Sequence, residues 1–198
     1  NSFLPALPYA IEAASEFRKA CNLIASDRTP EADRVIRSID SQALTQHYNN
    51  VVNEWTPRHE ASTAPLPSSA ANRAKERMPP KTVEWEIYAR DGWHCRWCGT
   101  PVISARANKR MSLVFPVLYG KGPRNVDIHG LIMCAQASLD HVEPHSIGGT
   151  NEPDNLVTAC WPCQFARGND DFRRLGLTDP RNRSPLATDW DGCDWFRP

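Results

Sequence analysis

Residues 140–164 read DHVEPHSIGGTNEPDNLVTACWPCQ, and this stretch decides the fold of the chain. Its Asp-His dipeptide, Asp140–His141, lies between two Cys-x-x-Cys pairs. The four cysteines of these pairs are Cys95, Cys98, Cys160 and Cys163. A two-residue spacer turns both sulfurs of a pair toward one ion, so two such pairs are typical of a tetrahedral four-cysteine zinc site. The same zinc clip would hold an acid and a base between its halves.

The alternatives to zinc are a chance coincidence of the two pairs and a redox-active Cys-x-x-Cys. Redox sites of the thioredoxin kind need one pair beside a βαβ pattern, which this sequence lacks. The total of seven cysteines is odd, which disfavours a disulfide framework. We therefore favour structural Zn²⁺ and expect a reducing compartment, the cytoplasm.

Composition limits the function in further ways. The chain has 198 residues with 23 basic and 23 acidic side chains, so its formal net charge is zero. Any binding to nucleic acid must therefore come from local patches of charge. No apolar run is long enough to cross a membrane, and the first residues lack the basic and apolar regions of a secretory signal.

Apolar spacing predicts helices over 5–25 and 30–54, the second capped by Thr29, so that residues 1–55 form a helical hairpin of unknown role. Residues 56–80 have the Pro, Ser and Ala content of a linker. Residues 81–198 would form the second unit, which includes a C-terminal tail and begins with a short helix that ends at Gly92.

A long connection, residues 99–126, follows the first cysteine pair and contains no acidic residue. Its basic residues are Arg106, Lys109, Arg110, Lys121 and Arg124. They would follow a nucleic-acid backbone, where cations replace condensed counterions; the alternative is a solvated loop. Within it, SLVFPVLYG (112–120) resembles a strand, and residues 128–139 a short helix that leads to Asp140.

Three stretches in order, RDGWHCRWCG (90–99), DHVEPHSIGG and NLVTACWPC, resemble the HNH endonuclease family. The resemblance covers about residues 83–170. It implies an α+β, loop-rich, zinc-stapled ββα-metal domain, here preceded by the N-terminal helical region. In such a domain two strands and a helix grip a divalent ion, and we expect the helix to begin near Gln164.

The resemblance also implies roles for the residues between the cysteine pairs. His141 would be the general base that takes a proton from water, for which a pKa near neutrality is suited. Asp140 would bind a catalytic Mg²⁺ or Mn²⁺, which prefer oxygen ligands. Asn155 would tie the loop so that His141 points correctly.

Gln164 departs from the family pattern, which has His or Asn there as the second ligand of the ion. Gln offers the same amide oxygen as Asn on a longer stem, so the site either still binds the ion or is degenerate. Arg167 stands where the family often has Lys and would bind phosphate. His145 would contact a phosphate or the loop backbone, and the tryptophans near the cysteines would shield the zinc.

The leading hypothesis is a divalent-metal-dependent DNA endonuclease that leaves 5′-phosphate and 3′-hydroxyl ends, in restriction or phage defence. Cutting both strands of duplex DNA would take a homodimer or two events. The second hypothesis is a zinc-stabilised nucleic-acid-binding module with an inactive site, for which Gln164 is the main support. RNA is a third possibility, as the substrate.

Overall fold

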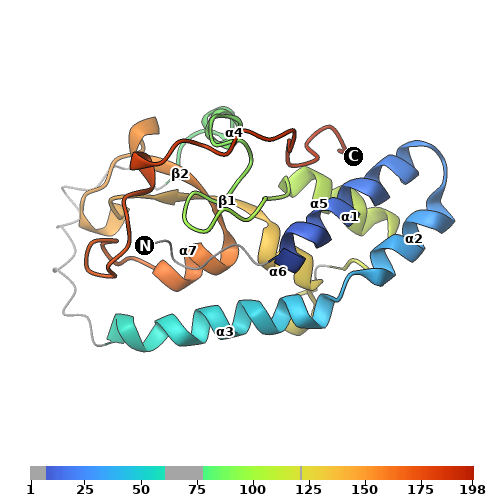
Figure 1. Cartoon of the computed structure of the whole chain (residues 1–198), viewed down its shortest axis with the longest axis horizontal. Coiled ribbons are helices and arrows are strands. Elements are labelled where there is room, and N and C mark those ends of the chain that lie inside the picture. The colour runs from blue at the N-terminus through green and yellow to red at the C-terminus, as the bar shows by residue number, and fades with distance from the viewer. Residues whose placement is uncertain (1–7, 61–77, 121) are drawn as a thin grey trace.

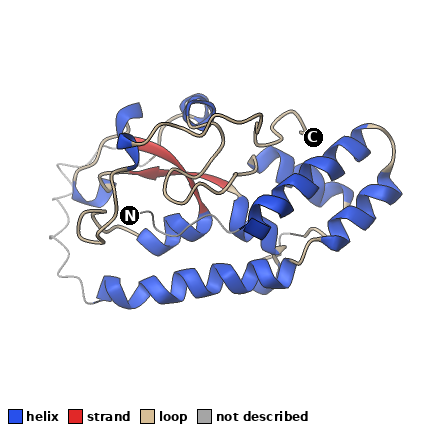
Figure 2. Ribbon diagram, in the orientation of Figure 1, coloured by secondary structure: helices blue, strands red, loops and turns tan. Residues whose placement is uncertain are grey.

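The computed structural model describes residues 8–60, 78–120 and 122–198, and of residues 54–60 the backbone alone. Helices dominate, and one two-stranded antiparallel sheet joins them (Figures 1 and 2). This mixture confirms the α+β class. No helix among the described residues has the length and apolar character that spanning a bilayer requires.

The N-terminal part contains α1 (Pro8–Ala25), α2 (Thr29–Ser38) and α3 (Ser41–Glu60). The prediction of one helix over 30–54 is wrong, because Ile39 is extended with ψ 120°. Asp40 Oδ1 then accepts the backbone N–H of Ala43 at 2.9 Å, so it caps a new helix. Thr29 is the first residue of α2 and makes no side-chain cap. The predicted linker 56–80 lies outside the described residues at 61–77, and its first residues continue α3.

These helices share one core with later parts of the chain. Phe17 and Ile36 are fully buried and belong to one apolar cluster with Leu131 of α6 (Gly130–Ala135) and Phe196 of the tail. Gly130 lets α6 approach α3 closely, because a Cβ on it would lie 2.1 Å from the Ser41 carbonyl oxygen. Accordingly, α3 packs on α6 and also on α7 (Trp161–Arg167).

Residues 105–114 form helix α5 (Ala105–Val114), so the prediction of a strand over 112–120 is wrong. Ser104 caps the helix, because its hydroxyl accepts the N–H groups of the second and third residues of α5, Arg106 and Ala107. Met111, Phe115 and Tyr119 recur every fourth residue and are all buried. This four-residue spacing puts them on one side of a helical path, whereas a strand would alternate its faces.

The second core surrounds a β-hairpin. Strand β1 (Ala137–His141) pairs with β2 (Leu156–Cys160), and α4 (Lys81–Arg90) contacts β2. The short helix predicted over 128–139 is therefore α6 followed by β1. Helix α7 follows β2 directly, and Pro162 in its first turn suits a helix start. The helix thus begins at Trp161 and not near Gln164, which places Cys163 in its first turn.

Candidate functional site

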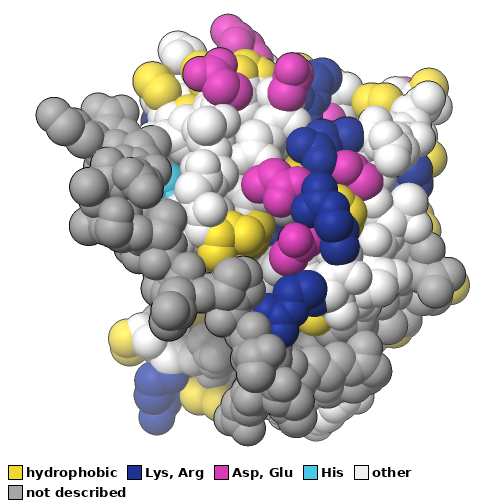
Figure 3. All heavy atoms as spheres, turned by 90° about the vertical axis from the view of Figure 1, so that its left-hand side faces the viewer, with side chains coloured by type: hydrophobic (Ala, Val, Ile, Leu, Met, Phe, Trp, Pro, Cys, Tyr) yellow, Lys and Arg dark blue, Asp and Glu magenta, His cyan; other side chains and the backbone are white. Residues whose placement is uncertain are grey.

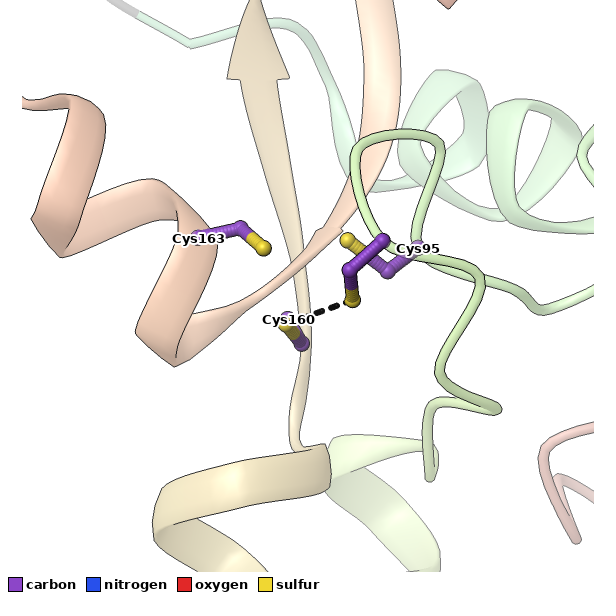
Figure 4. Close-up of side chains that lie close together, drawn as sticks. Cys95, Cys160 and Cys163 are labelled. Atoms are coloured by element: carbon purple, nitrogen blue, oxygen red, sulfur yellow. Dashed lines mark hydrogen bonds between the residues drawn. The ribbon is translucent and has the colours of Figure 1, made fainter. Parts of the chain in front are cut away.

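Four cysteines converge between β2, α7 and the loop before α5. All four Sγ atoms lie within 4.8 Å of one another, and Cys98 and Cys160 are 3.8 Å apart. A tetrahedral zinc with bonds of about 2.3 Å separates its sulfurs by about 3.8 Å. Figure 4 shows three of the side chains, Cys95, Cys160 and Cys163, directed toward a common point. The cysteines are thus positioned to bind a metal ion, as predicted.

The first pair sits in a tight knuckle. The backbone N–H of Gly99 donates to the Cys95 carbonyl at 2.8 Å, and the N–H of Cys95 donates to the Thr100 carbonyl at 2.8 Å. Thiols of the other cysteines, Cys160 first, hold the pKa of Cys98 well below its ordinary value. The neighbouring thiols and burial instead raise the pKa values of Cys160 and Cys163. Cys98 is therefore the member of the cluster that most readily becomes a thiolate, the form that binds zinc.

Strand β1, the loop that follows it and helix α7 line a cleft of about 670 Å³. Asp140 and His141 end β1, while Gln164 and Arg167 lie on α7, and all four line this cleft. His145 from the connecting loop lies beside them, with its ring centre 5.8 Å from that of His141. The ββα arrangement therefore brings together the acid, the base and the amide that the sequence singled out.

The Asn155 side chain holds the loop between β1 and β2 through hydrogen bonds to the loop backbone. Its Oδ1 accepts the N–H of Glu143 at 2.8 Å, and its Nδ2 donates to the carbonyls of Glu143 at 3.0 Å and of Thr150 at 2.9 Å. Gly149 allows the tight turn, because a Cβ there would lie 1.8 Å from the Glu143 oxygen. The loop that leaves His141 is thus held at both ends by one side chain.

His141 is mostly buried, and burial lowers its pKa below the ordinary value. Its Nε2 lies 2.8 Å from Asn151 Oδ1. Since an amide oxygen only accepts, Nε2 carries the proton and Nδ1 keeps the lone pair. The side chain is therefore a neutral imidazole near pH 7, in the state that a general base requires.

Asp140 is engaged by two side chains. Its carboxylate accepts a bidentate pair of bonds from Arg167, at 2.8 Å to Oδ2 and 2.5 Å to Oδ1. Trp97 Nε1 donates to the same Oδ2 at 2.9 Å. Arg167 is only 1% exposed and also donates to the carbonyls of His141 and Asp170. Arg167, expected to bind phosphate, is therefore turned inward.

Gln164 binds the sheet with one half of its amide. Its Nε2 donates to the Leu139 carbonyl at 2.8 Å. Among the described residues none donates to its Oε1, which remains for the cleft. One amide oxygen and the remaining lone pair of Asp140 fit a hard divalent ion that takes its other ligands from water or phosphate.

Residues 127–170 match the family model of HNH endonucleases. The chain therefore carries an HNH segment. The match spans α6, both strands, the loop and α7, and confirms the resemblance predicted from the sequence. Members of this family are nucleases that act on nucleic acid and use divalent metal ions. No curated protein and no solved structure matches the chain.

The described basic residues of the connection 99–126 do not line the HNH cleft. In Figure 1, α5 lies beside α1 and away from α7. Arg106 stacks on Trp85 at 4.1 Å and Arg110 donates to the Arg197 carbonyl. Arg124 pairs with Asp127, Lys109 is exposed, and Lys121 lies outside the described residues. Three of these five cations thus already have protein partners.

Charges of both signs also alternate near the HNH segment. Arg173 binds Glu143 at 2.6 Å, and Arg181 binds Asp179 at 2.6 Å. Figure 3 shows Lys and Arg side chains on that side of the molecule interleaved with Asp and Glu. The described side chains on this face therefore form no broad surface of a single sign.

Sequence reasoning missed two contacts of the HNH cleft. Asn151, which binds His141, follows the Gly-Gly turn and carries no pattern that separates it from an ordinary loop residue. Trp97, expected to shield the zinc, also donates its ring N–H to Asp140. Both contacts join residues distant in sequence, so no local spacing signals them.

Proposed function

We propose that the chain is a divalent-metal-dependent DNA endonuclease that hydrolyses phosphodiester bonds. The observation that carries this proposal is a neutral, oriented His141 in one cleft with Asp140 and Gln164, inside the segment that matches HNH endonucleases. The four-cysteine site, which we assign to structural Zn²⁺, would join the first turn of α7 to the loop before α5.

His141 would accept the proton of the attacking water at Nδ1. The Asn151 oxygen stabilises the opposite N–H, so it favours this tautomer and also the imidazolium that forms. Asn155 supports the same step indirectly, because it fixes the loop that carries Asn151. Proton removal at a positioned base contributes roughly 10²–10⁴-fold to such reactions.

Asp140 Oδ1 and Gln164 Oε1 would hold a catalytic Mg²⁺ or Mn²⁺. When bound, the ion stabilises negative charge on the phosphate and on the leaving oxygen. Attack by water on phosphorus with loss of the 3′ oxygen yields 5′-phosphate and 3′-hydroxyl ends. Phosphate contacts would come from His145 in the cleft and from the exposed Lys109, with Lys121 a further candidate.

Duplex DNA is the substrate we favour. Cutting both of its strands would take either a homodimer or two separate cleavage events. Restriction or phage defence is the biological role proposed. All seven cysteines are unpaired, which supports work in the reducing cytoplasm.

A second candidate is a zinc-stabilised module that binds nucleic acid without cutting it. The Arg167 ion pair on Asp140 favours it, because that pair occupies carboxylate oxygens that an ion would need. Nicking of a supercoiled plasmid distinguishes the two candidates.

The zinc-loaded chain is incubated with plasmid and Mg²⁺ or Mn²⁺, beside variants His141→Ala and Gln164→Asn. Nicking by the native chain that disappears in His141→Ala supports the endonuclease. Nicking that survives His141→Ala refutes the mechanism. Cleavage gained only with Gln164→Asn identifies a degenerate site.

Matched controls lie on α3, outside the cleft lining. His47→Ala and Gln42→Asn make the same chemical changes there and are expected to leave nicking unchanged. Parallel digestion of single-stranded RNA tests the choice of DNA.

A further inference from the structure

We propose that Arg167 is the positioning residue of the HNH cleft and that its guanidinium competes with the divalent ion for the Asp140 carboxylate. This inference rests on the proposed function, because it concerns the ion of that same site. It reassigns Arg167 from a contact of substrate phosphate to an internal cation of the protein.

The geometry leaves Arg167 little freedom to act elsewhere. Its Nε and Nη2 bind the two oxygens of Asp140, and Nη2 also donates to the His141 carbonyl. Its Nη1 donates to the Asp170 carbonyl at 2.9 Å. Four of the five N–H donors of the guanidinium are thus used inside the protein. The side chain is 1% exposed, so a phosphate in the cleft meets almost none of its surface.

The same contacts limit what Asp140 can offer an ion. A carboxylate has about four lone-pair sites. Arg167 takes one on each oxygen, and Trp97 takes a second on Oδ2 at 2.9 Å. One site on Oδ1 remains. Asp140 can therefore give an ion a single bond and not a bidentate one.

Charge acts in the same direction as geometry. The guanidinium already neutralises Asp140, and it would repel a second cation on the same carboxylate in a buried setting where screening is weak. A buried carboxylate that loses its partner is left uncompensated. Removal of Arg167 should therefore make Asp140 a much better ligand for a divalent ion.

Arg167 also joins three parts of the site. Its carbonyl bonds hold the end of β1 at His141 and the chain after α7 at Asp170, and its guanidinium lies 5.2 Å from the Trp97 ring centre. One side chain thus fixes the acid and the backbone of the base together.

The test measures Mn²⁺ binding to the zinc-loaded full chain by electron paramagnetic resonance, with nicking recorded separately. Arg167→Gln should bind Mn²⁺ at least tenfold more tightly than the native chain, and adding Asp140→Asn should abolish the gain. Arg167→Lys keeps a charge but loses the bidentate fork, so its Mn²⁺ affinity should lie between that of the native chain and that of Arg167→Gln. Arg174→Gln, at an exposed arginine outside the cleft lining, is the matched control and should change nothing.

Affinities within twofold of native in Arg167 variants that retain zinc and a native melting transition overturn the proposal. Asp140→Asn in the native background gives an independent test if those variants do not fold. Because Arg167 already neutralises Asp140, which can give the ion only a single bond, this change should lower Mn²⁺ affinity less than tenfold, and a larger loss overturns the proposal. Absent nicking by the native chain refutes the endonuclease, whereas the Mn²⁺ titration reports on the Arg167–Asp140 pair in either case.

Discussion

Asn155 offers the sharpest test of how the HNH loop is held. Replacement by aspartate keeps the shape of the side chain but turns the Nδ2 donor into an acceptor. In the native chain this group donates to the carbonyls of Glu143 and Thr150, and the side chain is 8% exposed. The carboxylate of Asn155→Asp would therefore face two carbonyl oxygens with little water to screen them.

The expected cost follows from these contacts. Two lost hydrogen bonds cost about 1–3 kcal/mol, and the buried unpaired charge adds further destabilisation. We expect Asn155→Asp to lower the free energy of unfolding by about 3–5 kcal/mol at pH 7.5. Asn155→Ala loses all three bonds but buries no charge, so its cost should be smaller, about 2 kcal/mol.

The pH dependence separates charge from shape. The folded state of Asn155→Asp should bind a proton more readily than the unfolded state, because a protonated carboxyl can again donate to a carbonyl. Its stability relative to the control should therefore recover as pH falls from 7.5 to 4.5. Asn182→Asp is the control, at an exposed position in the tail.

Urea unfolding of the zinc-loaded chain, followed by the fluorescence of its seven tryptophans, measures these differences. Nicking should fall at least tenfold in Asn155→Asp, because the released loop no longer holds Asn151 on His141. The reasoning is refuted if Asn155→Asp is as stable as Asn182→Asp at pH 7.5, or if Asn155→Ala costs under about 0.5 kcal/mol.

Three further outcomes test different parts of the structure. Gly149→Ala, whose Cβ would lie 1.8 Å from the Glu143 oxygen, should cost about 3 kcal/mol or more in urea unfolding, whereas Gly176→Ala, at φ 68° in open space, should cost about 1 kcal/mol. Burial lowers the pKa of His129 to about 4, so the unfolded state binds more protons between pH 6.5 and 4 and native stability falls as pH drops through that range. His129→Asn keeps a cap for α6, and between pH 6.5 and 4 its free energy of unfolding should fall less than that of the native chain, by up to about 3 kcal/mol. Equal pH dependence of the two proteins would refute this assignment. Chelation of the metal, or Cys163→Ser, should abolish the cooperative melting transition of the hairpin core, because a four-cysteine site contributes roughly 10–16 kcal/mol to folding; an unchanged transition after verified metal loss would contradict that role.

Local patterns account for the parts of the prediction that are confirmed. The spacing of the cysteines, the Asp-His dipeptide and the order of the strands and helix lie within short stretches, where backbone geometry turns spacing into direction. The prediction of a strand over 112–120 is wrong because Ser104 caps a helix upstream. Burial of Tyr119 continues the four-residue spacing of apolar side chains beyond the end of that helix. The single helix over 30–54 failed because the Asp40 side chain starts a new one.

The sequence by itself determined the cysteine cluster, the ββα order around Asp140 and His141, and the match of residues 127–170 to HNH endonucleases. Only the tertiary structure decided which arginine side chains already have a partner within the protein. Arg167 and Arg106 look alike in the sequence, yet one is buried on Asp140 and the other is stacked on Trp85. The physical reason is that the partner of a long side chain depends on which distant segments pack beside it.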